Sequence, residues 1–123
     1  MVQNKVLSLI GLAMRAGKVA SGEFAAEKAV KSGLASVVLV AGDASENTKK
    51  MFANMCTYYK VPVYFYSDKE TLGAAIGKVY RASVAVTDEG FGKAIEDRLR
   101  DDYEKMNEEK KDGGSKYGKN QSK

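Results

Sequence analysis

The run from Ser36 to Ala41 (Ser-Val-Val-Leu-Val-Ala) most constrains what this chain can fold into. It is apolar almost without a break and mostly β-branched, which is typical of a strand covered on both faces. A sheet that contains such a strand needs a layer of helices on each side. The rest of the chain must therefore supply helices for two faces.

Helical and strand patterns alternate on both sides of this run. Apolar residues at helical spacing predict helices over 4–16, 22–33, 46–59, 68–77 and 89–110. Short apolar runs predict strands at 19–20, 36–41, 61–66 and 82–87. One helix followed by four strand–helix units indicates an α/β protein with a four-stranded, mostly parallel sheet between two helix layers.

Side chains at the helix starts and along the helices refine this prediction. Ser or Asp before a helix caps its first N–H groups, and apolar residues on one face point to the core. The expected caps are Asn4, Ser21, Ser45 and Asp88, with Ser67-Asp68-Lys69-Glu70 as a capping box. The residues expected to pack inward are Met51, Phe52, Met55 and Tyr59 in one helix, and Phe91, Ile95, Leu99, Tyr103 and Met106 in the last.

The length of 123 residues predicts a single core. We expect residues 1–100 to form one domain and residues 101–123 to form a charged helix extension and a disordered tail. No apolar run approaches the roughly 18 residues of a membrane helix, and the N-terminus has no signal-peptide layout. These features predict a cytoplasmic protein that does not enter a membrane.

Composition argues against several kinds of chemistry. The chain has no histidine and one cysteine, so it lacks the usual ligands of a zinc site and the commonest general base. Cys56 cannot form an intramolecular disulfide, which favours a reducing compartment, and a lone thiol on a helix is typical of a small buried side chain. We therefore expect no metal, no cofactor and no catalytic residues.

Two motifs, one that suggests phosphate binding and one that suggests acid–base catalysis, fail on inspection. The residues Gly11 to Lys18 resemble a phosphate-binding loop, but five residues separate the glycines and Val19 replaces the hydroxyl that would hold magnesium. The acids Asp88 and Glu89 open a helix, where the helix dipole alone favours them. Neither motif supports a catalytic site.

Charge points instead to a polyanionic partner. The net charge is +4, and residues 1–100 carry all of it, with 14 basic and 10 acidic side chains. The stretch from Gly17 to Gly33 runs through a glycine turn into a helix, whose free N–H groups form a candidate anion site. Phe24 in this stretch fits either a stacking face for a base or a core position.

Basic residues fall in two segments that the sheet could bring together. Loops at the tips of parallel strands can meet at one edge, which would join the segments into a split basic patch for RNA. The first segment supplies Arg15, Lys18, Lys28 and Lys31, and the second supplies Lys78 and Arg81.

Several motifs, in order, resemble the superfamily of small ribosomal proteins that bind kink-turn RNA, and in particular its bacterial YlxQ-type branch. The resemblance covers residues 1 to about 98. The motifs that carry it are Ser21-Gly22-Glu23 with Lys28-Ala29-Val30 and Gly33, the run 37–41 with Asp43-Ala44-Ser45, the stretch 56–63, the stretch 72–78, and the segments 11–18 and 43–50.

This resemblance implies a three-layer αβα sandwich and non-catalytic RNA binding. It implies that the glycine loop with Gly22 and Lys28, and the loop bordered by Gly77 and Lys78, grip the RNA. Kink-turn binders of this superfamily carry Asn-Glu two and three residues after the glycine, where this chain has Phe24 and Ala25. Neither side chain can hydrogen-bond to a base edge.

Our first hypothesis is thus a protein that binds structured RNA, with kink-turn RNA as a candidate, on the ribosome. The alternative is a protein-interaction module of the translation or transcription machinery with degenerate RNA binding. A third hypothesis is an enzyme fragment related to RNA methyltransferases. The sequence shows no catalytic domain that would support it. The candidate RNA-binding residues are Arg15, Lys18, Ser21, Gly22, Glu23, Phe24, Lys28, Lys31, Gly77, Lys78 and Arg81.

Overall fold

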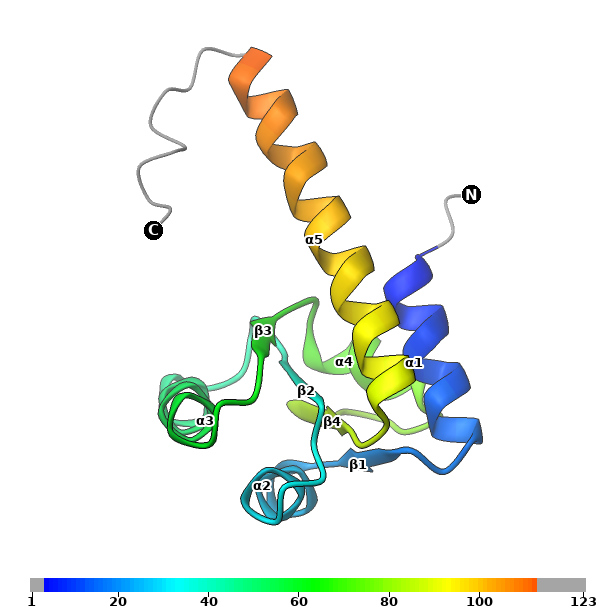
Figure 1. Cartoon of the computed structure of the whole chain (residues 1–123), viewed down its shortest axis with the longest axis vertical. Helices are drawn as coiled ribbons and strands as arrows, with labels where there is room; N and C mark the ends of the chain where they lie inside the picture. Colours follow the sequence, from blue (N-terminus) through cyan, green and yellow to red (C-terminus); the bar gives the residue numbers. More distant parts are fainter. Residues whose placement is uncertain (1–3, 113–123) are drawn as a thin grey trace.

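The computed structural model describes the backbone of residues 4–112 and the side chains of residues 4–104 (Figure 1). The predicted order of elements is confirmed. The elements are α1 (Lys5–Arg15), β1 (Val19–Ser21), α2 (Glu23–Lys31), β2 (Val37–Val40), α3 (Glu46–Tyr59), β3 (Val63–Phe65), α4 (Lys69–Ala75), β4 (Ser83–Val86) and α5 (Glu89–Asp112).

The four strands form one sheet in the order β1-β4-β2-β3. Only β2 and β3 run parallel, with Val38 opposite Val63, whereas β4 pairs antiparallel with both β1 and β2. The expectation of a mostly parallel sheet is therefore wrong, and the sheet is mixed. Burial patterns report which residues are covered and not which way a strand runs. The short α4 and the loop after it bring the chain back so that β4 runs in the opposite direction to β2.

Helices cover both faces of the sheet, which makes the predicted three-layer sandwich. Val37 and Leu39 of β2 face α1, α4 and α5, whereas Val38 and Val40 face α2 and α3 (Figure 1). All four residues of β2 are fully buried. This confirms that the apolar run at the centre of the sequence is a strand covered on both sides.

Three of the expected caps are confirmed by hydrogen bonds from backbone N–H groups near the start of a helix. Each bond satisfies a donor that the helix itself leaves unpaired. Asn4 accepts from Leu7 at 3.0 Å, Ser45 from Thr48 at 3.1 Å, and Asp88 from Phe91 at 2.9 Å.

The other two expected caps are wrong by one residue. Ser21 is the last residue of β1, paired opposite Val84, and Gly22 is the residue that precedes α2. Asp68 rather than Ser67 caps α4, because its side chain accepts from the N–H of Thr71 at 2.7 Å. This hydrogen bond holds the pKa of the Asp68 carboxyl below its usual range.

Most of the predicted core residues are buried, including Phe52, Met55 and Ile95. Tyr59 and Tyr103 are exposed, which corrects the prediction for both. Tyr59 ends α3 beside the left-handed residue Lys60. Tyr103 belongs to α5, the helix that continues past the sheet (Figure 1). The Met106 side chain and the tail 113–123 lie outside the described residues, and a domain boundary near residue 100 stays a prediction.

Candidate nucleic-acid interface

The start of α2 is an uncapped helix N-terminus. Gly22 precedes the helix with a φ of +93°, and no side chain in the described chain caps it. A Cβ at Gly22 would meet nothing within 4 Å, so the backbone faces open space. An open helix N-terminus with free N–H groups attracts anions such as phosphate.

A second segment, the loop after α4, is held in a fixed shape. The N–H of Lys78 donates to the carbonyl of Gly73 at 2.8 Å, and that of Arg81 donates to Lys69 at 3.1 Å. A Cβ on Gly73 would lie 2.8 Å from the Val79 oxygen, so the loop packs directly on the α4 backbone. These contacts fix the loop while Lys78 stays exposed.

The two segments meet. The Arg81 Nε donates to the Ser21 Oγ at 3.4 Å, and the N–H of Gly22 donates to the carbonyl of Ser83 at 3.0 Å. We call Ser21–Glu23 together with Gly77–Arg81 the α2–β4 junction. From the sequence, the basic residues of 15–31 could meet Lys78 and Arg81 at the tips of parallel strands, and the structure brings the 77–81 loop to the start of α2 in another way. The structure joins them because β1 and β4 pair antiparallel.

Arg15 and Lys18 lie apart from this junction. The carbonyl of Lys18 accepts from the N–H of Thr87, which places Lys18 at the opposite end of β1 from Gly22. The three residues of β1 separate these ends by about 10 Å. Both side chains are exposed, so they stay separate candidate contacts for a larger ligand.

Along α2, Phe24, Lys28 and Lys31 follow one another at helical spacing. They line a shallow hollow of about 380 Å³ together with Glu27 and Ser32. Phe24 is 80% exposed, which answers the open question of its position: it is a surface residue and not a core residue. An exposed aromatic ring beside cationic side chains is suited to stacking against a base.

The lysines of this candidate interface differ in whether they form an ion pair within the protein. Lys31 lies 2.8 Å from Glu27, and this hydrogen bond raises the Lys31 pKa. In the part of the chain whose side chains are described, no carboxylate lies within 4 Å of the ammonium of Lys18, Lys28 or Lys78. These three lysines can therefore pair with an external anion without breaking an internal ion pair.

Sequence reasoning missed two residues of the junction. Val79 is 75% exposed and Tyr80 is 59% exposed, so the loop presents apolar surface between Lys78 and Arg81. Their signal in the sequence is a pair of apolar residues between two basic ones, outside any helical or strand pattern. Exposed apolar residues at a rigid loop are typical of contact sites.

Other kinds of site receive no support from the described residues. Among the described side chains, residues 4–104, no group of three or more from histidine, cysteine, aspartate and glutamate could hold a metal ion. None of the helices in residues 4–112 is long and apolar enough to span a bilayer. Cys56 is buried, as predicted, and burial raises the pKa of its thiol to about 11. A thiol with this pKa is a poor nucleophile at neutral pH.

Comparisons with known proteins agree with this fold. The Ribosomal protein L7Ae/L30e/S12e/Gadd45 family matches residues 4–96. RNA-binding protein YlxQ of Bacillus subtilis is 46% identical over 87 residues, which cover 71% of this chain and 87% of that protein. RNA-binding protein YlxQ of Enterococcus faecium is 39% identical over 97 residues, which cover 79% of this chain and 93% of that protein.

Two solved structures share the architecture. A Bacillus halodurans protein of unknown function superposes with a TM-score of 0.77 at 37% identity, over 80% of this chain and 99% of the other. A 15.5 kD RNA-binding protein of Giardia lamblia gives a TM-score of 0.68 at 20% identity, over 82% and 90% of the two chains, and shows the fold alone. With its fold, its glycine-opened α2 and these matches, the chain belongs to the ribosomal protein L7Ae/L30e/S12e/Gadd45 family.

Proposed function

We propose that this protein is a non-catalytic RNA-binding protein that recognises structured RNA at the α2–β4 junction and acts on the ribosome in the cytoplasm. One observation carries the proposal. The Arg81–Ser21 and Gly22–Ser83 hydrogen bonds hold the open start of α2 beside the 77–81 loop. The names of the two bacterial relatives support RNA as the ligand class.

The junction and the neighbouring exposed residues of α2 supply two kinds of contact for such a ligand. The first-turn N–H groups of α2, with Lys28 and Lys78, would bind phosphates, which accounts for affinity. Phe24 and Tyr80 are exposed and would stack against unpaired bases, and the exposed Val79 adds apolar contact surface beside them. Stacking replaces the hydrogen bonds that an Asn-Glu pair would make, so we propose that a kinked, partly unstacked RNA binds better than a regular duplex.

The test is a binding titration of the full chain against a kink-turn RNA and against a matched duplex without the kink, at two salt concentrations. The kinked RNA is expected to bind more tightly than the duplex. Affinity for both should fall with added salt, because each phosphate contact releases counterions. Equal, weak binding to both RNAs would contradict shape recognition and leave only phosphate contacts.

A charge-matched pair of variants locates the site. Lys28→Gln should weaken binding and reduce the salt slope by about one unit, as expected for one lost phosphate contact. Lys50→Gln removes the same charge from the exposed face of α3 and should leave both unchanged. If the two variants behave alike, RNA binding does not occur at α2.

Absence of any RNA binding would instead favour the alternative, a protein-interaction module of the translation or transcription machinery. Methyl transfer to RNA by the purified chain would overturn the proposal that the protein is not an enzyme. Neither a protein-docking role nor methyl transfer is needed to explain the exposed residues of the junction.

A further inference from the structure

A pair of exposed tyrosines ends α3. Tyr58 is 77% exposed and Tyr59 is 41% exposed. Their ring centroids lie 4.9 Å apart with the ring planes at 79°, which is an edge-to-face contact. Lys60 follows them with a φ of +61° and is exposed as well. We call Tyr58–Lys60 the α3 end. It offers two aromatic rings and a cation to a ligand.

The α3 end lies at the same end of the sheet as the last turn of α2. α2 leads into β2 and α3 leads into β3, and these two strands run parallel. Both helices pack on one face of the sheet and are seen end-on in Figure 1. The N–H of Val38 donates to the carbonyl of Pro62 at 2.9 Å, which joins the segments that follow the two helices. A ligand that follows α2 from its start to its end therefore arrives at the α3 end.

Lys31 links the hollow along α2 to the α3 end. Its side chain lines that hollow together with Phe24 and Lys28. Glu27 is the main cause of the raised pKa of Lys31, and the charge of the ionised Tyr59 hydroxyl adds a smaller effect in the same direction. Such a charge effect requires the two groups to lie near each other. We call the residues that follow one another in this way the α2–α3 strip: Phe24, Lys28, Lys31, Tyr58, Tyr59 and Lys60.

The charges of the α2–α3 strip favour a polyanion. In the part of the chain whose side chains are described, no carboxylate lies within 4 Å of the ammonium of Lys28 or Lys60. The acid that lines the hollow, Glu27, is paired with Lys31 at 2.8 Å. Lysines interleaved with exposed aromatic rings are typical of surfaces that bind single-stranded nucleic acid, where the rings stack on bases and the cations contact phosphates.

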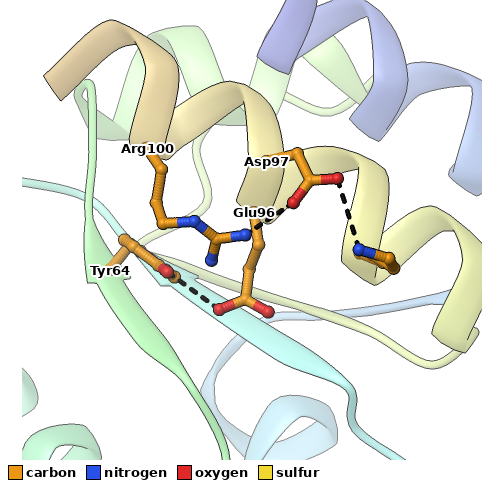
Figure 2. Close-up of polar contacts among 5 residues, drawn as sticks. Tyr64, Glu96, Asp97 and Arg100 are labelled. Carbon is orange, nitrogen blue, oxygen red and sulfur yellow. Dashed lines mark hydrogen bonds and ion pairs between the residues drawn. The ribbon is translucent and has the colours of Figure 1, made fainter. Parts of the chain in front are cut away.

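The opposite face of the sheet has a different chemistry. Helix α5 carries nine acidic and six basic side chains, a net charge of −3 in a chain of net +4. Figure 2 shows that the Arg100 guanidinium is bonded to Asp97 and that the Tyr64 hydroxyl donates to Glu96. These charges favour the α2–α3 strip over α5 as the path of an RNA strand that leaves the junction.

We propose that the α2–α3 strip binds a single-stranded extension of the RNA held at the α2–β4 junction. The bases of this extension stack on Phe24 and on the tyrosine pair, while its phosphates contact Lys28 and Lys60. The inference rests on the proposed RNA binding and adds one feature to the ligand, a single strand that flanks the kinked segment. The nine residues of α2 span about 13 Å, so the extension must be several nucleotides long to reach the α3 end.

The test compares three RNAs in binding titrations with the full chain. One is a kink-turn RNA with blunt ends, one carries a tail of about six adenosines, and one carries an abasic tail of equal length. Each tail is placed at the 5′ end or at the 3′ end in separate RNAs. The adenosine tail at one of these ends should tighten binding about tenfold, because its bases stack on the tyrosines. The abasic tail keeps only the phosphates and should give a smaller gain.

Variants of the α3 end locate the contact. Tyr58→Ser with Tyr59→Ser should lose the gain from the adenosine tail and keep the wild-type affinity for the blunt RNA. Lys60→Asn should reduce the gain from both tails, since asparagine tolerates the left-handed backbone but carries no charge. Tyr103→Ser removes a 62% exposed tyrosine from α5 and is the matched control, which should behave as wild type.

The outcomes separate this inference from the proposed function. Equal affinity for blunt and tailed RNAs, equal gains from the adenosine and abasic tails, or a full gain in the double variant would overturn the inference and leave RNA binding at the junction in place. Failure of the chain to bind any of the RNAs would overturn both. If the double variant also loses affinity for the blunt RNA, Tyr58→Ser alone decides, because it changes only the more exposed ring. An undiminished gain in Tyr58→Ser would then count against the strip.

Discussion

Gly22 donates its backbone N–H to the carbonyl of Ser83 at 3.0 Å, which fastens the start of α2 to the start of β4. The two residues are distant in sequence, and neighbouring Ser21 also accepts a hydrogen bond from Arg81. The junction proposed to bind RNA is thus held by one backbone and one side-chain hydrogen bond, and the exposed side chains of Lys78, Val79 and Tyr80 take no part in either. Substitutions should reveal this division of roles.

Gly22→Ala should destabilise the protein by about 1–3 kcal/mol, because a φ of +93° is strained for any side chain with a Cβ. It should also weaken RNA binding, since the start of α2 must move. Gly33→Ala is the control: its φ is +80°, and it too has open space around it, but it lies at the other end of α2. Thermal unfolding and RNA titration of both variants separate strain from binding. Equal RNA affinity in the two would contradict a role for the α2 start.

Gly73→Ala should displace the loop that contains Val79 and Tyr80. The new methyl group would lie 2.8 Å from a backbone oxygen, and such overpacking costs about 1–3 kcal/mol. Gly11→Ala makes a similar contact, 3.0 Å from the Ala75 oxygen of α4 and not with the loop residues Val79 and Tyr80. Both variants should melt earlier, but only Gly73→Ala should lower RNA affinity. Loss of RNA affinity in Gly11→Ala would show that stability alone controls binding.

Ser83→Ala should stabilise the fold or leave it unchanged. The hydroxyl is fully buried and has no hydrogen-bond partner among the described residues, so its removal relieves a desolvation cost of about 1 kcal/mol. Ser36→Ala is the contrasting variant, because the Ser36 Oγ lies 2.9 Å from the Asp88 carbonyl and 3.0 Å from that of Val86. Denaturant unfolding should place Ser83→Ala at or above the stability of wild type and Ser36→Ala below it. The reverse order would be inconsistent with this account.

Cys56 should resist alkylation in the native protein at pH 8. Burial raises its thiol pKa to about 11, so the reactive thiolate is scarce and shielded. The reaction should become rapid once denaturant is added. In Thr57→Cys, the new thiol at an exposed position should react at once while Cys56 stays protected. Mass spectrometry counts the alkylated thiols, and prompt double labelling in Thr57→Cys would refute the burial of Cys56.

Tyr64 should make the protein less stable at alkaline pH. Burial, followed by the hydrogen bond and the charge of Glu96, raises the Tyr64 pKa above its ordinary value. The folded state therefore holds this proton more tightly than the unfolded state does. The resulting stability is complete below the unfolded-state pKa and is lost as pH rises through the folded-state pKa.

Tyr64→Phe removes this titration, so its free energy of unfolding should fall less steeply than that of wild type above about pH 10. Tyr58→Phe, on the exposed end of α3, should follow wild type. Denaturant unfolding at several alkaline pH values measures the slopes. Identical slopes for Tyr64→Phe and wild type would show that Tyr64 is not coupled to folding.

The sequence alone determined the order of the helices and strands and most of the residues that are buried. The run from Val37 to Val40 predicted a strand covered on two faces, because apolar periodicity records burial directly. Local capping chemistry likewise placed the starts of α1, α3 and α5 at Asn4, Ser45 and Asp88. The glycine opening of α2 and the basic loop were also visible in the sequence as separate candidates.

Only the tertiary structure decided how these elements meet. Strand direction depends on which strands pair, so the antiparallel insertion of β4 between β1 and β2 could not be inferred from burial. That pairing moves Ser21 from a helix cap into a strand and brings Arg81 to it. The exposure of single residues such as Phe24 and Tyr103 depends on what packs opposite them, and a local sequence pattern holds no record of that neighbour.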